Sequence, residues 1–336
     1  MSDLNRWATS RSFERSRELL NGAIDLHVHA GPHLKSSPRS ADPVQAAMQA
    51  KEAGMRALVF MDVFLMSTGT AWMVNRLVPD FTCFGGIILS TVMGGLNPRA
   101  VKTAMQYGDG AKFVSFGAHS TAHQASKDGA IVDGEYVRHI DRFPKFVDEE
   151  YSRSVAIPLD GKLTPAFREI MEVVAGNPEL YVVSGHVSPA EALALIDITK
   201  DFGIEKLMLS HTVVSEMSLA QMQDAAARGA LLEIDFCQFT HTPSIPKTHY
   251  YVEPEWRSTF SASSEVAMGG MKVIADKIRV VGAQHCVFVT DFGVYSLPAP
   301  VEGMRNLVAS LLDLEFSLEE IELMIKHNPA RLLGLE

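Results

Sequence analysis

His27 and His29 are separated by one residue at the end of the first apolar segment of the chain, residues 23–29. Side chains alternate between the two faces of a β-strand, so both imidazoles are expected to point to the same side. Two imidazoles about 7 Å apart along one strand can converge on one ion, and neutral imidazole is a common ligand of zinc-like metals. The pair alone is weak evidence, because histidines at this spacing are more often hydrogen-bonded than metal-bound.

Three further residues with metal-binding side chains come just after other apolar segments. His186 follows residues 180–184, His211 follows residues 206–210, and Asp291 follows residues 286–290. If these segments are strands of one barrel, their carboxyl ends meet in one ring. A single metal site explains all five residues together, whereas separate structural roles would each need their own explanation. The pattern therefore predicts a divalent-metal site.

The elements that would position this site alternate between short apolar runs and longer amphipathic runs. Eight runs are expected to be strands, at residues 23–29, 56–61, 84–89, 112–116, 180–184, 206–210, 230–235 and 286–290. This alternation is typical of a parallel sheet buried on both faces. A doubly wound sheet gives the same alternation. The strand count and the polar residues at the strand ends favour an α/β protein with a (β/α)8 TIM barrel.

Two long segments interrupt the repeat, after the fourth and the seventh strands. Residues 118–164 are polar and rich in His and Asp, and residues 236–264 contain prolines and aromatics. Both leave the carboxyl ends of strands, so we expect long loops that act as lids or pocket walls. The predicted organisation is an N-terminal helical extension, residues 1–22, followed by a single barrel, residues 23–336, that carries these two insertions.

The composition limits the partners and the compartment. A net charge of −10 repels phosphate backbones, so we expect no nucleic-acid partner. Cys83, Cys237 and Cys286 lie far apart, which argues against a disulfide framework and suits a reducing compartment. Residues 1–20 lack the apolar stretch of a signal peptide, and no apolar run approaches the roughly 20 residues of a membrane span. A cytoplasmic protein without a membrane partner is predicted, and a homo-oligomer is left open.

The pattern of metal-binding residues resembles that of the amidohydrolase superfamily of metal-dependent hydrolases. The superfamily pattern is His-x-His on the first strand, single histidines after the fifth and sixth strands, and aspartate after the eighth. Residues 327–335 (HNPARLLGL) are also similar to the closing motif of the superfamily. Residues 22–32 (GAIDLHVHAGP) resemble a family of unknown function, DUF6282, within it. The resemblance covers essentially the whole predicted barrel.

The resemblance implies a role for each matching residue. His27, His29 and Asp291 would hold the more buried ion, and His186 and His211 would bind a second ion, or one of them would contact the substrate. The implied metal is zinc, with manganese as the alternative, as one ion or two. Asp291 would also be the general base that takes a proton from the metal-activated water, with His211 as a second catalytic candidate.

The chain departs from the superfamily pattern at the bridging ligand. Binuclear members usually supply a carboxylated lysine or a glutamate at the end of a middle strand. Lys112 is at the start of the fourth strand, so we expect it near the bottom of the barrel in a structural role. The number of ions is therefore left open.

Other polar residues near the predicted mouth are candidates for contacts with a small-molecule substrate. These residues follow the first, fourth and seventh strands, and they are His33, Lys35, Arg39, His119, His123 and His241. A cation after the first strand could bind a substrate carboxylate. His139, outside this set, is expected to be a surface or structural residue.

Three functions are compatible with this sequence. The leading hypothesis is a metal-dependent hydrolase that adds water at an amide, cyclic amide, lactone or ester carbonyl. A metal-dependent, non-oxidative decarboxylase of an aromatic acid is the first alternative, because the missing bridging lysine is compatible with one ion. A non-catalytic barrel that binds a metal or a ligand is the second alternative, with a closed four-ligand site as its signature.

Overall fold

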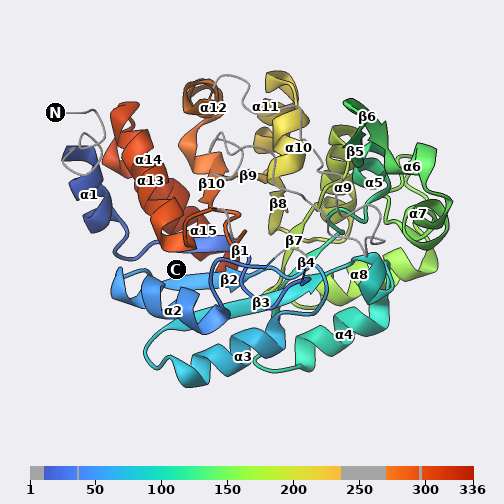
Figure 1. The fold of residues 1–336 in the computed structure, drawn as a ribbon, viewed down its shortest axis with the longest axis horizontal. Helices are drawn as coiled ribbons and strands as arrows, with labels where there is room; N and C mark the ends of the chain where they lie inside the picture. Colours follow the sequence, from blue (N-terminus) through green and yellow to red (C-terminus); the bar gives the residue numbers. More distant parts are fainter. Residues whose placement is uncertain (1–10, 36–37, 236–269, 295–296) are drawn as a thin grey trace.

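The computed structural model describes residues 11–35, 38–235, 270–294 and 297–336. Eight parallel strands stand at its centre, and helices surround them (Figure 1). The strands are hydrogen-bonded in the order β1-β2-β3-β4-β7-β8-β9-β10. Their bounds are β1 (Ile24–Val28), β2 (Ala57–Phe60), β3 (Thr82–Ile88), β4 (Ala111–Ser115), β7 (Tyr181–Val183), β8 (Leu207–Leu209), β9 (Leu231–Asp235) and β10 (Cys286–Val289).

The helices follow the strands in the order expected of a barrel. They are α1 (Arg11–Leu19), α2 (Pro43–Glu52), α3 (Thr68–Leu77), α4 (Pro98–Gln106), α5 (Ala122–Lys127), α6 (His139–Arg142), α7 (Pro144–Glu149), α8 (Pro165–Ala175), α9 (Pro189–Asp201), α10 (His211–Glu216), α11 (Leu219–Ala227), α12 (Gly270–Val281), α13 (Pro300–Asp313), α14 (Leu318–Glu322) and α15 (Asn328–Leu333). Helix α1 packs against α13, so the start of the chain lies beside its last helices (Figure 1).

Local sequence signals explain where several helices begin. Asp42 and Ser188 cap α2 and α9 with their side chains, and each is part of a reciprocal capping box. Proline occupies the first turn of both helices, where its missing N–H is not needed. These signals fix the start of two helices that follow β1 and β7, the strands after which His29 and His186 are found.

The first and last strands close the ring. The backbone N–H of His29 donates to the carbonyl of Phe292 at 2.9 Å, and the N–H of Asp291 donates to the carbonyl of His27 at 3.1 Å. Gly293 has φ +146°, and a Cβ at this position would come within 1.6 Å of the carbonyl oxygen of His29. Closure confirms the predicted (β/α)8 barrel and excludes the doubly wound alternative.

Asp25 ties the same two strands together from inside the barrel. Its carboxylate accepts hydrogen bonds from the backbone N–H of His27 at 3.1 Å and from the N–H and hydroxyl of Thr290 at 3.2 and 2.6 Å. The side chain is fully buried, and burial raises the pKa of Asp25 to about 6 in spite of these hydrogen bonds. Asp25 therefore stabilises the seam, which is the contact between β1 and β10 that brings the histidine pair close to Asp291.

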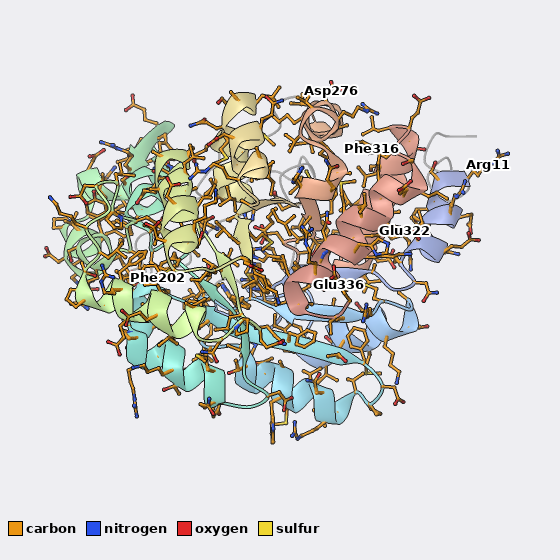
Figure 2. All side chains as sticks on the ribbon, turned by 180° about the vertical axis from the view of Figure 1, so that it is seen from behind. Arg11, Phe202, Asp276, Phe316, Glu322 and Glu336 are labelled. Atoms are coloured by element: carbon orange, nitrogen blue, oxygen red, sulfur yellow. The ribbon has the colours of Figure 1, made fainter. Side chains whose placement is uncertain are left out.

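The core lies on both sides of the strands. On β9, Leu232 and Ile234 face the helix-packed core, whereas Glu233 and Asp235 lie on the opposite face and are buried in the barrel. Figure 2 shows side chains filling the space between the strands and the surrounding helices. The inward face thus changes from apolar to polar toward the carboxyl ends of the strands.

The segment after β4 is folded, which corrects the expectation of a long loop there. It contains α5, α6, α7 and an antiparallel hairpin of β5 (Gly129–Val132) and β6 (Glu135–Arg138), and it lies to one side of the barrel (Figure 1). The predicted insertion at residues 236–264 lies outside the described residues. No helix in the described part of the chain combines the length and the apolar character that a membrane span requires.

The hydrogen bonds that Asp25 accepts at the seam lead to a prediction about the stability of the protein. Replacement Asp25→Ala is expected to lower the free energy of unfolding by roughly 2–4 kcal/mol, because three buried donors lose their acceptor. Urea unfolding followed by circular dichroism measures this change. Thr290→Val removes one donor and keeps the side-chain shape, so it should cost only about 1 kcal/mol. An Asp25→Ala protein as stable as the wild type would show that the seam does not depend on this carboxylate.

Candidate metal centre

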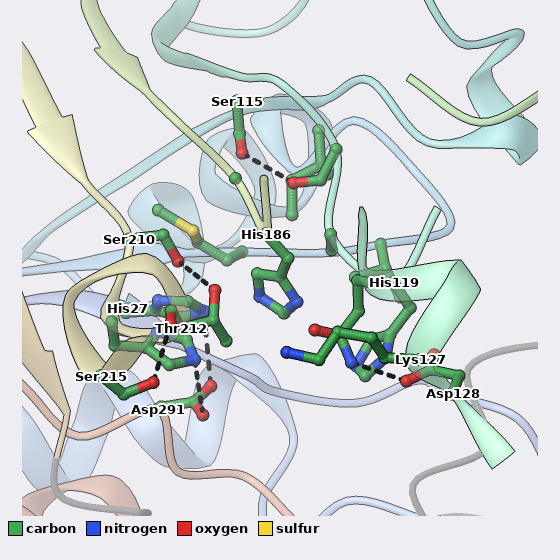
Figure 3. A pocket seen from close by; sticks show the side chains of 18 of the residues that line it. His27, Ser115, His119, Lys127, Asp128, His186, Ser210, Thr212, Ser215 and Asp291 are labelled. Atoms are coloured by element: carbon green, nitrogen blue, oxygen red, sulfur yellow. Dashed lines mark hydrogen bonds and ion pairs between the residues drawn. The ribbon is translucent and has the colours of Figure 1, made fainter. Parts of the chain in front are cut away.

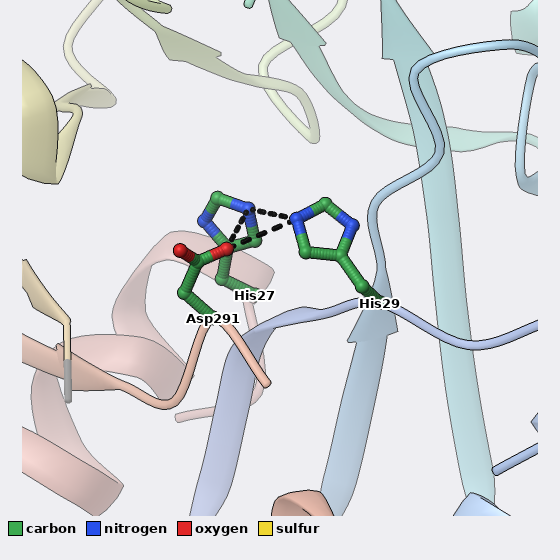
Figure 4. A group of neighbouring side chains, drawn as sticks. All are labelled: His27, His29 and Asp291. Atoms are coloured by element: carbon green, nitrogen blue, oxygen red, sulfur yellow. Dashed lines mark hydrogen bonds and ion pairs between the residues drawn. The ribbon is translucent and has the colours of Figure 1, made fainter. Parts of the chain in front are cut away.

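Three side chains from the two strands at the seam point toward one another. The Nε2 atoms of His27 and His29 are 3.1 Å apart, and Oδ1 of Asp291 lies 3.4 and 3.0 Å from them (Figure 4). A separation of 3.1 Å between two imidazole nitrogens fits either an N–H of one ring donating to the other or both lone pairs directed at one metal cation. His27, His29 and Asp291 therefore form a cluster with the donor types of a divalent-metal site.

His211 joins this cluster from the other side. It is the first residue of α10, and its Nε2 lies 3.7 Å from Oδ2 of Asp291. The rings of His27 and His211 are 5.4 Å apart, as are those of His211 and His186. In the described part of the chain, His186 belongs to none of the groups whose ligand atoms converge within 4.8 Å. Its ring lies next to the ring of His211, outside the group of converging ligand atoms.

Hydrogen bonds on the far side of each ring fix its orientation. Nδ1 of His29 donates to the carbonyl of Met61 at 2.8 Å. Nδ1 of His27 and Nδ1 of His211 lie 2.8 and 3.1 Å from the two carboxylate oxygens of Glu233. A carbonyl or carboxylate oxygen only accepts, so all three Nδ1 atoms carry hydrogen. The three Nε2 atoms are thereby the ones that face the cluster.

The electrostatics of the cluster favour a cation. Burial alone would lower the pKa of His211, but Asp235, Asp291 and Glu233 raise it to about 10. Burial also opposes the charge of His27, yet Glu233 and Asp291 raise the pKa of that imidazole as well. The carboxylates thus hold protons on the histidines, and a divalent ion supplies the same positive charge.

The pKa values of the two remaining ligand candidates, His29 and Asp291, are lowered, in contrast to those of His27 and His211. Burial, with smaller contributions from Arg39 and His27, lowers the pKa of His29 to about 4, so His29 is neutral at pH 7. Burial would raise the pKa of Asp291, but the nearby His211 and His27 hold it well below its usual value. A neutral imidazole and an ionised carboxylate are the forms that bind a metal.

The backbone of Asp291 is held in a conformation that few residues adopt. Its φ is +54°, in the left-handed region, where aspartate and asparagine are the most tolerated residues after glycine. The chain turns here between the end of β10 and Phe292, which is fully buried. This turn presents the carboxylate to the histidines of β1.

A cavity of about 460 Å³ opens above the cluster. His27, His29, His211 and Asp291 line its base, and His186 projects into it (Figure 3). The folded segment after β4 provides a wall, with the side chains of His119, Gln124, Lys127, Asp128, Tyr136, Arg138 and His139. A volume in the range of roughly 300–1,000 Å³ is typical of small-molecule sites.

The structure separates the residues expected to contact a substrate. Arg39 and His119 line the cavity, and Nδ1 of His119 lies 3.1 Å from Asp128. His33, Lys35 and His123 do not line the described part of the cavity, so their contact with a substrate stays a prediction. His241 lies outside the described residues.

Contacts with other side chains hold two of these residues in place. His123 is turned toward Glu216 at 2.8 Å, and the ring of His33 lies against Phe64, 5.1 Å between centroids. Lys35 is exposed. Conversely, His139 lines the cavity although a surface or structural role was expected.

The carboxylates that contact the candidate ligands were not among the residues predicted from the sequence. Glu233 is fully buried between two histidines, and Asp235, two residues later on the same face of β9, is nearly so. Asp25 is the third, two residues before His27. The available signal was two carboxylates at alternating positions of an otherwise apolar strand, because such charges need buried partners. Lys112, as expected, is away from the site and pairs with Glu179 at 2.9 Å.

Comparison with known proteins identifies a family. The model of a family of unknown function (DUF6282) matches residues 22–233, more than half of the chain. A comparison with curated proteins returned no match. The predicted resemblance to this family is confirmed.

Solved structures share the whole fold at low sequence identity. A probable dipeptidase from Pseudomonas aeruginosa is 12% identical, with a TM-score of 0.61 and coverage of 96% of this chain and 98% of that one. A candidate 2-pyrone-4,6-dicarboxylic acid hydrolase from Pseudomonas putida is 12% identical, with a TM-score of 0.54 and coverage of 94% and 98%. An amidohydrolase from Pseudomonas aeruginosa is 11% identical, with a TM-score of 0.57 and coverage of 95% and 98%. At these identities the likeness establishes a common fold.

The pKa shifts predict that zinc uptake releases protons. In the metal-free protein at pH 7, His211 is protonated because its pKa is about 10, and the raised pKa of His27 favours its protonated form as well, whereas a ligand must be neutral. We therefore expect release of at least one proton per ion, and an apparent affinity that falls as the pH is lowered further below the raised pKa values. Calorimetric titration in two buffers with different ionisation enthalpies measures the release. Equal heats in both buffers would contradict it, and His211→Gln should release fewer protons than the wild type.

Proposed function

Because the chain belongs to a family of unknown function (DUF6282) and folds as an amidohydrolase-like barrel, we propose that it is a metal-dependent hydrolase of a small molecule. The observation that carries the proposal is the convergence of His27, His29 and His211 on the carboxylate of Asp291 at the mouth of the barrel. Active sites of barrel enzymes are found at this end of the strands.

His27, His29 and Asp291 would hold the ion, and His211 would be a further ligand. Imidazole nitrogens and one carboxylate favour zinc, with manganese as the alternative. A bound divalent ion would lower the pKa of water to about 7 and polarise a carbonyl oxygen. Lys127 and Glu216 line the described part of the cavity, but they form an ion pair with each other rather than a bridge between two ions, which favours a single ion.

Asp291 would move the proton in the reaction. One of its oxygens, Oδ1, faces the histidine pair, whereas the other, Oδ2, is directed toward His211. An ionised carboxylate within hydrogen-bond reach of the attacking water would accept its proton and pass it to the leaving oxygen or nitrogen. His211 would stabilise Asp291 in the orientation that this transfer needs.

The substrate class follows from the cavity and the chemistry. The cavity has the size of a small-molecule site, and its wall is rich in polar side chains. The proposed bond is an amide, cyclic amide, lactone or ester, since all of them react by addition of water at a carbonyl carbon. The structural neighbours include a probable dipeptidase and a candidate 2-pyrone-4,6-dicarboxylic acid hydrolase, which supports this range.

Removal and return of the metal test the proposal. A panel of 4-nitrophenyl acetate, dihydrocoumarin, dihydrouracil and N-acetyl amino acids would be assayed before and after treatment with a chelator. Hydrolysis should disappear on chelation and return with zinc or manganese. The double variant His27→Ala/His29→Ala should lose activity and metal together. Turnover that persists in this variant, or release of carbon dioxide from a hydroxylated aromatic acid in place of hydrolysis, would contradict the proposal.

The proposed role of Asp291 in proton transfer predicts the effect of one substitution on kcat. Replacement Asp291→Asn keeps the side-chain size and tolerates the left-handed backbone, but it removes the negative charge. We expect kcat to fall by about 10²–10⁴-fold with an unchanged far-ultraviolet circular dichroism spectrum. Zinc content measured on the same sample separates loss of the base from loss of the ion. A variant that retains zinc and near-wild-type kcat would exclude Asp291 as the base.

A further inference from the structure

Glu233 bonds two of the candidate ligands with one carboxylate. Oε1 lies 2.8 Å from Nδ1 of His27, and Oε2 lies 3.1 Å from Nδ1 of His211. Oε2 also accepts the backbone N–H of His211 at 2.9 Å. Glu233 is fully buried, so all three interactions are shielded from water.

The two histidines come from different parts of the ring. His27 is on β1 and His211 begins α10 after β8, whereas Glu233 is on β9 between them in the barrel order. Each ring could rotate about its own side-chain bonds if Nδ1 had no partner. A carboxylate that accepts from both Nδ1 atoms restricts both rotations at once, and it places both hydrogens on Nδ1.

We propose that Glu233 is a positioning residue that fixes the orientation and the tautomer of both His27 and His211 for metal binding. It does not contact the ion itself. Outer partners of this kind orient ligands, and their loss typically lowers metal affinity by about 10–100-fold. The inference rests on the proposed function to the extent that it takes a divalent ion bound by these two histidines.

A carboxylate is needed because both of its oxygens accept. Glutamine has one accepting oxygen and one donating amide, so it can accept from only one of the two Nδ1 atoms. The amide of Glu233→Gln would face the other histidine and favour hydrogen on its Nε2, the atom that must bind the ion. Aspartate keeps the charge but is shorter by one methylene, so Glu233→Asp should reach one histidine and not both.

Zinc affinity measured by chelator competition is the main test. Glu233→Gln and Glu233→Asp are each expected to weaken zinc binding by about 10–100-fold. The matched control is Glu191→Gln. Glu191 is also buried, but its carboxylate accepts from the backbone N–H groups of Ile157 and Ser188 rather than from a ligand. The Glu191→Gln variant should be less stable toward urea than the wild type and should bind zinc with unchanged affinity.

Coupling between residues gives a readout that a general loss of stability would not produce. In the His211→Ala background, Glu233→Gln should cost less zinc affinity than in the wild type, because one of the two positioned ligands is already gone. Nitrogen-15 spectra of histidine in the zinc-loaded wild type should show hydrogen on Nδ1 of both His27 and His211. This measurement needs no variant, so it applies even if Glu233→Gln does not fold.

The outcomes separate this role from the proposed function. Equal zinc affinity in the wild type and a folded Glu233→Gln variant would overturn the role of Glu233, as would hydrogen on Nε2 of both histidines. Weakened zinc binding in the variants, together with no hydrolysis of any substrate by the wild type, would support the role of Glu233 while contradicting the hydrolase. A wild type that does not bind zinc at all would overturn both.

Discussion

Buried negative charge at the mouth of the barrel is the constraint on which the rest of the site depends. Glu233 and Asp235 are almost inaccessible to water, and a carboxylate oxygen of Asp291 lies within 4.8 Å of one of Asp235. Carboxylates in such surroundings are stable only near positive charge. The histidines from β1 and α10 supply this charge as protons or share it with a metal ion. The ring of strands, the seam and the turn at Asp291 all serve to keep these groups within contact distance.

The sequence was sufficient to predict the eight strands and most of the side chains that cluster at their ends. His211 and Asp291 directly follow apolar runs, and a parallel barrel leaves one place where such residues can meet. Glu233 could not be found in the same way, because it lies inside an apolar run and its partners are distant in sequence. Its role becomes visible only when His27, more than two hundred residues earlier, is known to lie across the barrel from it.

The residues of the wall were the hardest to predict. Arg39 and His119 line the cavity, but His123, one turn further along the same segment, is turned away to Glu216. The direction of a side chain in an insertion is set by tertiary contacts, here with α10, which no local pattern encodes. Likewise, a polar stretch predicted as a loop folds into a hairpin and short helices that pack on one another around a small apolar cluster, with Ala125 and Phe146 buried in it.

The closing seam also bears on when the protein becomes functional during its synthesis. His27 and His29 emerge from the ribosome before Asp291, which directly follows the end of β10. Domains form as the chain is made from its N-terminus, but this ring can close only after β10 is available. A chain interrupted before β10 would carry the histidine pair without its carboxylate. Assembly of the site thus waits for the synthesis of β10 and Asp291, so chains terminated before this point would lack the complete site.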